Sequence, residues 1–206
     1  MLVANSRRRG VLIAFTGTDG AGKSTQASLL GMRLNESGHQ TFVSEGKDDL
    51  VPLFLKRWQE SGHTLDAGTM GLVMAVEIVR SNARMIAPLL DVGINVVAPR
   101  SVFCQLGFEK ASANPEAERI ESLLTFCGEP DLIIMLDVPV KTTIERVVTR
   151  GIDSEDPEVM ESFRHELHKM ASDRRFVVID GDRPQTQVHE DVWRACYDRL
   201  FARSVE

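Results

Sequence analysis

Eight consecutive residues near the N-terminus carry the clearest chemistry of the sequence. Residues 17–24 read Gly-Thr-Asp-Gly-Ala-Gly-Lys-Ser and match the pattern GxxxxGK[ST]. Glycines let the backbone wrap closely, so that successive N–H groups and the N-terminus of a following helix point at phosphate oxygens. Lys23 is expected to neutralise phosphate charge, and Ser24 to bind Mg²⁺ through its hydroxyl. The motif therefore predicts a site for ATP and Mg²⁺, and an ordinary glycine-rich turn is the alternative.

The elements around this loop follow a repeating strand and helix pattern. Short apolar or β-branched runs predict strands at 11–15, 41–44, 94–98, 132–138 and 176–179. Helical periodicity predicts helices at 23–37, about 69–90, 140–149, 157–171 and 188–201. Runs that are apolar on both faces are typical of parallel strands covered by helices. The expected fold is α/β, with three layers and a five-stranded parallel sheet.

Length and charge restrict the remaining possibilities. A chain of 206 residues fits one domain, expected over residues 11–206, behind a disordered basic tail at residues 1–10. The net charge of −6 argues against nonspecific binding to nucleic acid or acidic membranes. The apolar run after the tail is too short for an export signal, and no stretch is long enough to cross a membrane. Three widely spaced cysteines suggest neither disulfides nor zinc, so a cytoplasmic protein is expected.

Four parts of the chain resemble thymidylate kinases, which belong to the nucleoside monophosphate kinases. Residues 15–26 look like the family's opening FEGxDGxGKxTQ, and residues 72–77 with 84–89 are similar to the helix that lines its nucleotide pocket. Residues 130–139 are similar to its PDLTLxLDVP strand, and residues 176–181 resemble its C-terminal adenine-side strand. The resemblance implies an ATP-dependent phosphotransferase that uses Mg²⁺ and forms a homodimer.

The same resemblance assigns roles to charged side chains. Lys23 and Arg100 are expected to stabilise the transferring phosphoryl group, and Asp19 to contact substrate or metal. Arg146 and Arg150 share one helix face and are expected to reach the triphosphate when a short lid near residues 150–157 closes, although a solvated basic face is the alternative. The residues expected to hold ATP are Gly17, Asp19, Gly20, Ala21, Gly22, Lys23, Ser24, Thr25 and Arg146.

The acceptor pocket departs from the family pattern at four positions. The glutamate before the glycine-rich loop is Thr16, and the Glu-Pro after the second strand reads Glu45-Gly46. Ile78 stands where an arginine is expected to bind the monophosphate, and Pro99 stands where a carboxylate is expected near the metal. Because a phosphate dianion needs basic partners, these changes predict an altered acceptor.

Two interpretations follow from the altered pocket. The first is a kinase whose acceptor is a nucleotide or a nucleoside-like small molecule; an acceptor other than dTMP is favoured, and dTMP itself stays open. The second is a weak or inactive homologue that binds nucleotide and acts as a regulatory or interaction module. Phe108 is expected either to stack on an acceptor ring or to pack in the core. The residues expected to contact the acceptor are Glu45, Lys47, Glu77, Arg100 and Phe108.

Overall fold

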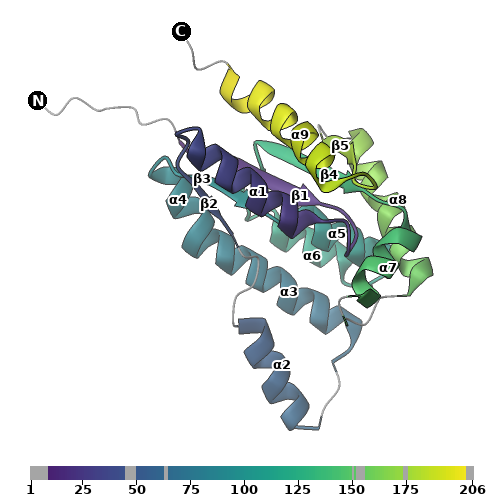
Figure 1. Ribbon diagram of the computed structural model, residues 1–206. Helices are drawn as coiled ribbons and strands as arrows, with labels where there is room; N and C mark the ends of the chain where they lie inside the picture. The colour runs from purple at the N-terminus through teal and green to yellow at the C-terminus, as the bar shows by residue number, and fades with distance from the viewer. Residues whose placement is uncertain are drawn as a thin grey trace, which may run out of the picture.

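A computed structural model describes residues 9–44, 50–62, 65–149, 151, 156–173 and 176–202. Its centre is one sheet of five parallel strands in the order β2-β3-β1-β4-β5 (Figure 1). The strands are β1 (Leu12–Thr16), β2 (Thr41–Val43), β3 (Asn95–Ala98), β4 (Leu132–Asp137) and β5 (Phe176–Asp180). All five strands were expected within about two residues of these bounds, and the predicted α/β fold is confirmed.

Helices cover both faces of this sheet. They are α1 (Lys23–Glu36), α2 (Leu50–Glu60), α3 (Ala67–Ser81), α4 (Ala87–Asp91), α5 (Val102–Ala111), α6 (Ala117–Leu124), α7 (Val140–Thr149), α8 (Pro157–Asp173) and α9 (Gln185–Cys196). In Figure 1, α1 and α9 lie together on one face, and α3, α5 and α6 lie on the other. The three expected layers are therefore present.

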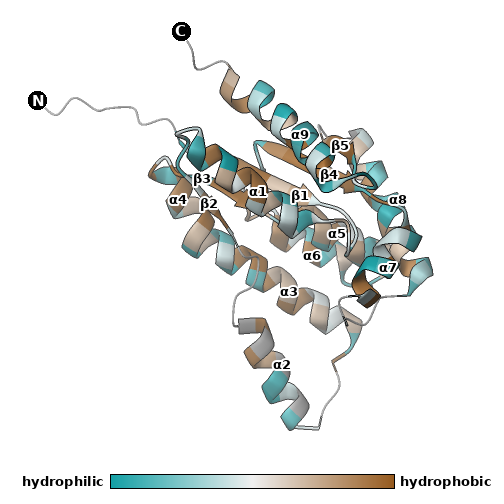
Figure 2. Cartoon of the chain, in the orientation of Figure 1, coloured by the Kyte–Doolittle hydropathy of each residue, from teal (hydrophilic) through white to brown (hydrophobic). Residues whose placement is uncertain are grey.

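Alternating side chains of β4 pack into two hydrophobic cores, one on each face of the sheet. Leu132, Ile134 and Leu136 pack in the core beneath α1 and α9. Ile133 and Met135 pack in the core shared with α3, α5, α6 and α8. Since successive side chains of a strand point to opposite faces, β4 is apolar on both sides. Figure 2 shows the helices turning hydrophilic residues away from the sheet.

The long helix expected at 69–90 contains a change of helical pitch. Helix α3 continues without a break into a π-helical turn, Asn82–Ile86, and then into α4. Pro88 has no N–H to donate to the carbonyl four residues before it, and a wider turn accommodates this defect. The backbone N–H of Ala87 accordingly bonds to the Asn82 carbonyl, five residues back. A second π turn, Tyr197–Phe201, ends the helical segment that begins with α9.

Three helices were not expected from the sequence, namely α2, α5 and α6. Helix α5 carries apolar side chains on most of its surface, and Phe103, Leu106 and Gly107 are buried. A helix buried on several sides lacks the polar stripe by which periodicity is detected. Helix α6 is short, with eight residues. The sequence pattern therefore left the segment that follows Arg100 unassigned.

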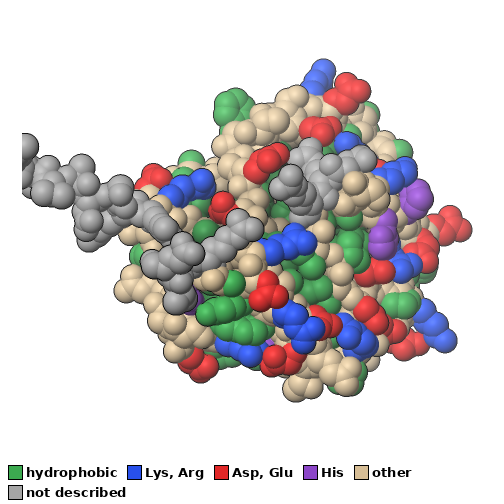
Figure 3. Space-filling view, turned by 90° about the horizontal axis from the view of Figure 1, so that it is seen from above, with side chains coloured by type: hydrophobic (Ala, Val, Ile, Leu, Met, Phe, Trp, Pro, Cys, Tyr) green, Lys and Arg blue, Asp and Glu red, His purple; other side chains and the backbone are tan. Residues whose placement is uncertain are grey.

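The outer surface carries both signs of charge. On the face seen in Figure 3, acidic and basic side chains are interspersed.

Residues 1–8 of the predicted tail lie outside the described residues, but Gly10 is buried and its N–H donates to the Leu90 carbonyl at 2.8 Å. Within the described ranges, none of the helices is both long and apolar enough to cross a membrane.

Candidate active site

The glycine-rich loop leaves the end of β1 and leads directly into α1. Gly20 and Gly22 have φ angles of 88° and 96°, which L side chains rarely adopt. A Cβ added to Gly20 would also lie 2.5 Å from the Thr143 carbonyl oxygen. The loop conformation therefore requires glycine at these positions, as the motif predicted.

The loop and the start of α1 fit a bound phosphate group. The N-cap residue Gly22 offers no side-chain acceptor, and the first turn of α1 has no acidic residue. The hydroxyl Oγ1 of Thr18 is buried and has no hydrogen-bond partner among the described residues. Ser24 and Thr25 are exposed at the first turn, so a hydroxyl is accessible to a metal ion. Free backbone donors at a helix N-terminus suit an anion such as ATP with its Mg²⁺.

Lys23 lies inside the curve of this loop. Its Nζ donates to the carbonyl oxygens of Gly17 at 2.8 Å and of Thr18 at 2.9 Å, and to Asp19 Oδ1 at 3.2 Å. The side chain is only 6% exposed. The ammonium group is therefore held among loop atoms at the place where the motif expects phosphate.

Asp19 joins this lysine to Arg100. Arg100 Nη2 donates to Asp19 Oδ1 at 3.1 Å, and both of these side chains are more than half exposed. Burial alone would raise the pKa of Asp19, but the charges and hydrogen bonds of Lys23 and Arg100 outweigh it and hold the pKa below its ordinary value. Asp19 is thus a carboxylate at neutral pH, suited to orienting a hydroxyl or a hydrated metal rather than to donating a proton.

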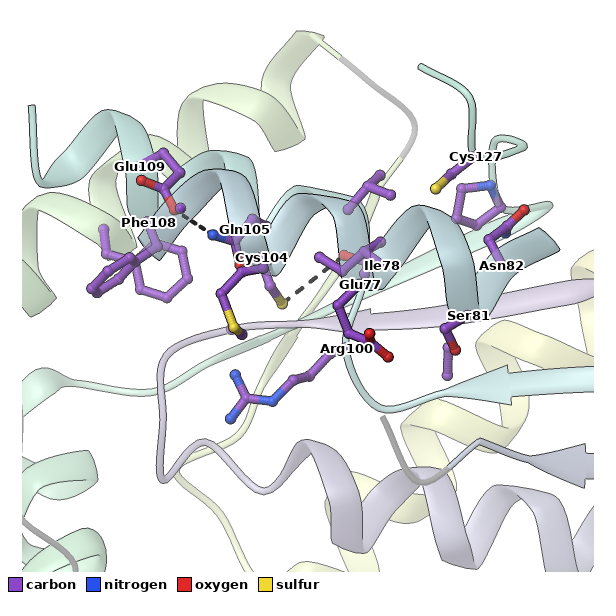
Figure 4. Close-up of a pocket in the computed structure, with 18 of the residues that line it drawn as sticks. Glu77, Ile78, Ser81, Asn82, Arg100, Cys104, Gln105, Phe108, Glu109 and Cys127 are labelled. Carbon is purple, nitrogen blue, oxygen red and sulfur yellow. Dashed lines mark hydrogen bonds between the residues drawn. The ribbon is translucent and has the colours of Figure 1, made fainter. Parts of the chain in front are cut away.

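A cavity of about 690 Å³ opens beside the loop, and Gly17, Asp19 and Arg100 line it together with side chains of α3 and α5. Figure 4 shows Ile78 among these lining residues. Arg100 is the one Lys or Arg among the described lining residues. Phe108 lines the cavity and also meets Phe163 edge to face, with ring centroids 5.8 Å apart. Phe108 therefore packs in the core, as one of its two predicted placements required, and its stacking on an acceptor ring stays a prediction.

Glu77 reaches the cavity from α3, where it was expected to contact the acceptor. Its carboxylate accepts two hydrogen bonds from Arg80, each at 3.1 Å, and the residue is buried. This pairing neutralises Glu77 and leaves less of its charge for an acceptor. Glu45 and Lys47, the other two predicted contacts from the segment after β2, lie outside the described residues.

Arg146 approaches the loop from α7 and is not among the described residues that line the cavity. Its guanidinium lies 3.4 Å from the carbonyl oxygens of Gly20 and Gly181 and 3.4 Å from Asp182 Oδ1. It therefore bridges the phosphate loop and the turn after β5, consistent with a triphosphate contact. Arg150 and most of the predicted lid lie outside the described residues, although Gly151, Asp156 and Pro157 are described.

The departures from the family pattern have structural consequences. Thr16 is fully buried, and its hydroxyl lies 3.1 Å from Cys104 Sγ, so this position faces α5. Pro99 is buried at the end of β3 and supplies no polar side-chain atom beside the loop. Among the departures in the described part of the chain, only Ile78 lies on the cavity wall.

One ion-pair cluster near the loop was missed by the sequence reasoning. Asp137, at the end of β4, accepts hydrogen bonds from Arg164 Nε at 2.7 Å and Nη2 at 3.0 Å, and His168 Nε2 lies 3.2 Å away. Burial alone would raise the pKa of Asp137, but its bonds to Arg164 and His168 lower it below the ordinary value. These contacts make Asp137 a clamp between β4 and α8.

Asp137→Asn is expected to destabilise the protein by about 1–2 kcal/mol at pH 7, because a bidentate, partly buried ion pair is lost. The lowered folded-state pKa means that this stability is present above the ordinary carboxyl range and disappears as pH falls through the folded-state pKa. Denaturant unfolding at several pH values tests this. The exposed pair of Glu190 with Arg33 gives a control. Glu190→Gln is expected to lower the free energy of unfolding by less than Asp137→Asn does. Equal losses in the two variants at pH 7 would contradict the clamp.

Comparison with known proteins gives a consistent result. The Thymidylate kinase family profile matches residues 15–192. A thymidylate kinase of Afipia carboxidovorans is 31% identical and aligns over 93% of this chain and 91% of its own length. A probable thymidylate kinase of Pyrococcus abyssi is 28% identical over 89% of this chain and 94% of its own. Together with the loop, Arg100 and Arg146, these matches show that the chain belongs to the thymidylate kinase family and is a phosphotransferase.

Proposed function

We propose that this chain is an ATP-dependent kinase that transfers the γ-phosphoryl group to a nucleoside-like acceptor other than dTMP, held in the cavity beside the phosphate loop. The observation that carries the proposal is the cavity wall. It begins at Gly17 and Asp19 in the phosphate loop, and Arg100 is the one cation among its described residues. A monophosphate dianion is poorly matched to such a wall, because phosphate recognition relies on several basic donors.

The proposed reaction uses the residues at the loop in separate roles. Lys23 and the N-terminus of α1 would hold the β- and γ-phosphates, and Ser24 would hold Mg²⁺, which when bound would offset negative charge on the phosphates. Asp19 accepts a hydrogen bond from the acceptor hydroxyl and orients it. The hydroxyl oxygen forms a bond to the γ-phosphorus while the bond from that phosphorus to the bridging oxygen breaks, so ADP leaves and the hydroxyl proton passes to solvent. Arg100 stabilises the charge of the group in transfer.

A coupled assay of ADP formation tests this proposal with nucleosides, nucleoside monophosphates including dTMP, and small hydroxylated metabolites. Turnover with a nucleoside-like acceptor, at a kcat/KM above that for dTMP, is the expected result. The best turnover with dTMP would contradict the proposed acceptor. ATP binding without turnover of any compound would favour the nucleotide-binding module instead.

Ile78→Arg in the same assay is expected to raise kcat/KM for dTMP by about 10- to 100-fold, the value of a new charged hydrogen bond to phosphate. Val92→Arg adds the same charge after α4, where Val92 is 55% exposed and outside the cavity lining, and is expected to change nothing. A similar gain in both variants would mean that overall charge, rather than the wall position, limits dTMP use.

We also propose that the chain forms a homodimer through helices on the cavity side. The support is the family resemblance, together with Val76, which is 50% exposed on α3. Sedimentation at micromolar concentration measures this directly. A monomer under those conditions would refute it.

A further inference from the structure

One buried carboxylate in the cavity has no role in the reaction described above. Glu109, on α5, is 4% exposed and lines the cavity. Gln105 Nε2 donates to its Oε1, and Asn114 Nδ2 donates to its Oε2. Figure 4 shows Glu109 and Gln105 side by side, joined by this bond. Both partners are neutral amides, and no Lys or Arg in the described part of the chain pairs with Glu109.

The surrounding bonds fix the orientation of these groups. A carboxylate only accepts hydrogen bonds, so both amides must turn their NH₂ groups toward it. Asn114 is held further, because its Oδ1 accepts from the Glu116 N–H at 2.9 Å and its Nδ2 also donates to the Ala67 carbonyl at 3.1 Å. Each Glu109 oxygen retains a lone pair after its single amide bond. The local chemistry at this part of the cavity is therefore that of an acceptor.

The charge balance of the cavity leads to the same conclusion. Its described acidic residues are Asp19, Glu77 and Glu109. Asp19 pairs with Lys23 and Arg100, and Glu77 pairs with Arg80. Of these three, Glu109 alone lacks a cationic partner among the residues that the structure describes. Burying a carboxylate without a cation is costly, and a ligand that brings N–H donors or positive charge would reduce that cost.

The distance between the two ends of the cavity suits a small organic acceptor. Arg100 and Asp19 lie at the phosphate loop, just before α5 begins at Val102. Glu109 lies about two helical turns further along α5, which corresponds to roughly 10 Å along the helix axis. A nucleoside-sized molecule with its reacting hydroxyl at Asp19 therefore presents its opposite end to Glu109.

We propose that the acceptor carries an amino group or a protonated amine, rather than a carbonyl, at the end that meets Glu109. A ligand carbonyl there would face a carboxylate with no hydrogen between them, and a buried mismatch of this kind discriminates strongly. This inference rests on the proposed function, since it names the chemical class of the acceptor for the same cavity.

Calorimetric titration of the full chain without ATP tests this inference. The probes are deoxycytidine against deoxyuridine and deoxyadenosine against deoxyinosine, since each pair exchanges an amino group for a carbonyl. The amino member of at least one pair is expected to bind about tenfold or more tightly. Equal affinities in both pairs, preference for the carbonyl members, or no binding of any probe would overturn the inference.

Two variants tie this preference to the proposed residue. Glu109→Gln is expected to reduce it to within about threefold, because an amide can serve a carbonyl as well as an amine. Glu121→Gln makes the same change at an exposed pair with Lys110 and is expected to keep the preference. An amino preference that survives Glu109→Gln would assign it to another group. If Glu109→Gln does not fold, the preference of the unaltered chain alone decides.

The outcomes also separate this inference from the proposed function. Amino preference in binding without any ADP formation would support the role of Glu109 and contradict the kinase proposal. ADP formation from a nucleoside-like acceptor without amino preference would support the kinase proposal and contradict the role of Glu109.

Discussion

Lys23→Ala is expected to lower kcat by a factor on the order of 10³ or more, because it removes the positive charge nearest the transferring group. The side chain is 6% exposed, and its Nζ is held by two loop carbonyls and Asp19. Its position therefore depends on the loop. Arg100 reaches Asp19 and Arg146 reaches the Gly20 carbonyl, but among the described side chains Lys23 alone donates to the carbonyls of Gly17 and Thr18. The coupled ADP assay measures the loss with the acceptor that gives the highest turnover.

Controls separate a chemical effect from an unstable loop. Lys23→Met keeps most of the apolar stem and is expected to lose as much activity as Lys23→Ala, since charge rather than packing is the cause. Lys169→Ala removes a lysine that is 57% exposed and paired with Glu166 on α8, and full activity is expected. Unchanged turnover in both Lys23 variants would refute the assignment of the loop as the phosphate site.

Arg100→Ala is expected to lower kcat by roughly 10²- to 10³-fold, the usual effect of removing one group that stabilises transition-state charge. A second consequence follows from its contact with Asp19. Arg100 helps to hold the pKa of Asp19 below its ordinary value. Without it the pKa of Asp19 rises, so the acidic limb of the kcat profile is expected to move to higher pH.

Matched variants sharpen this second test. Arg100→Lys keeps the charge but loses the planar fork, and an intermediate rate is expected. Arg119→Ala removes an arginine that is 77% exposed and bound to Glu116, the N-cap residue of α6, and no effect is expected. A loss of rate in Arg100→Ala with an unmoved pH profile would show that Asp19 does not act in its ionised form.

Much of the site follows from local sequence. The glycines of the loop are dictated by backbone conformation, and Lys23 and Ser24 by their spacing from them, so the phosphate site is readable from eight residues. The five strands are equally readable, because parallel strands buried on both faces leave continuous apolar runs.

The acceptor cavity is different, because residues far apart in the chain form it. Nothing in the sequence indicates that Arg100 bonds Asp19, 81 positions earlier, or that Asn114 and Gln105 both donate to Glu109. Helix α5, which carries two of these residues, is buried on several sides and shows no clear amphipathic period. Its existence was therefore not predicted.

The sequence by itself determined the fold class, the phosphate loop and the family, since these depend on short patterns that the chain carries intact. Only the tertiary structure decided that Asp137 serves as a clamp with Arg164, that Glu77 is neutralised by Arg80, and that Glu109 faces the cavity without a cationic partner in the described part of the chain. The physical reason is that the charge state and accessibility of a side chain depend on what packs around it, and packing brings together residues that no local pattern relates.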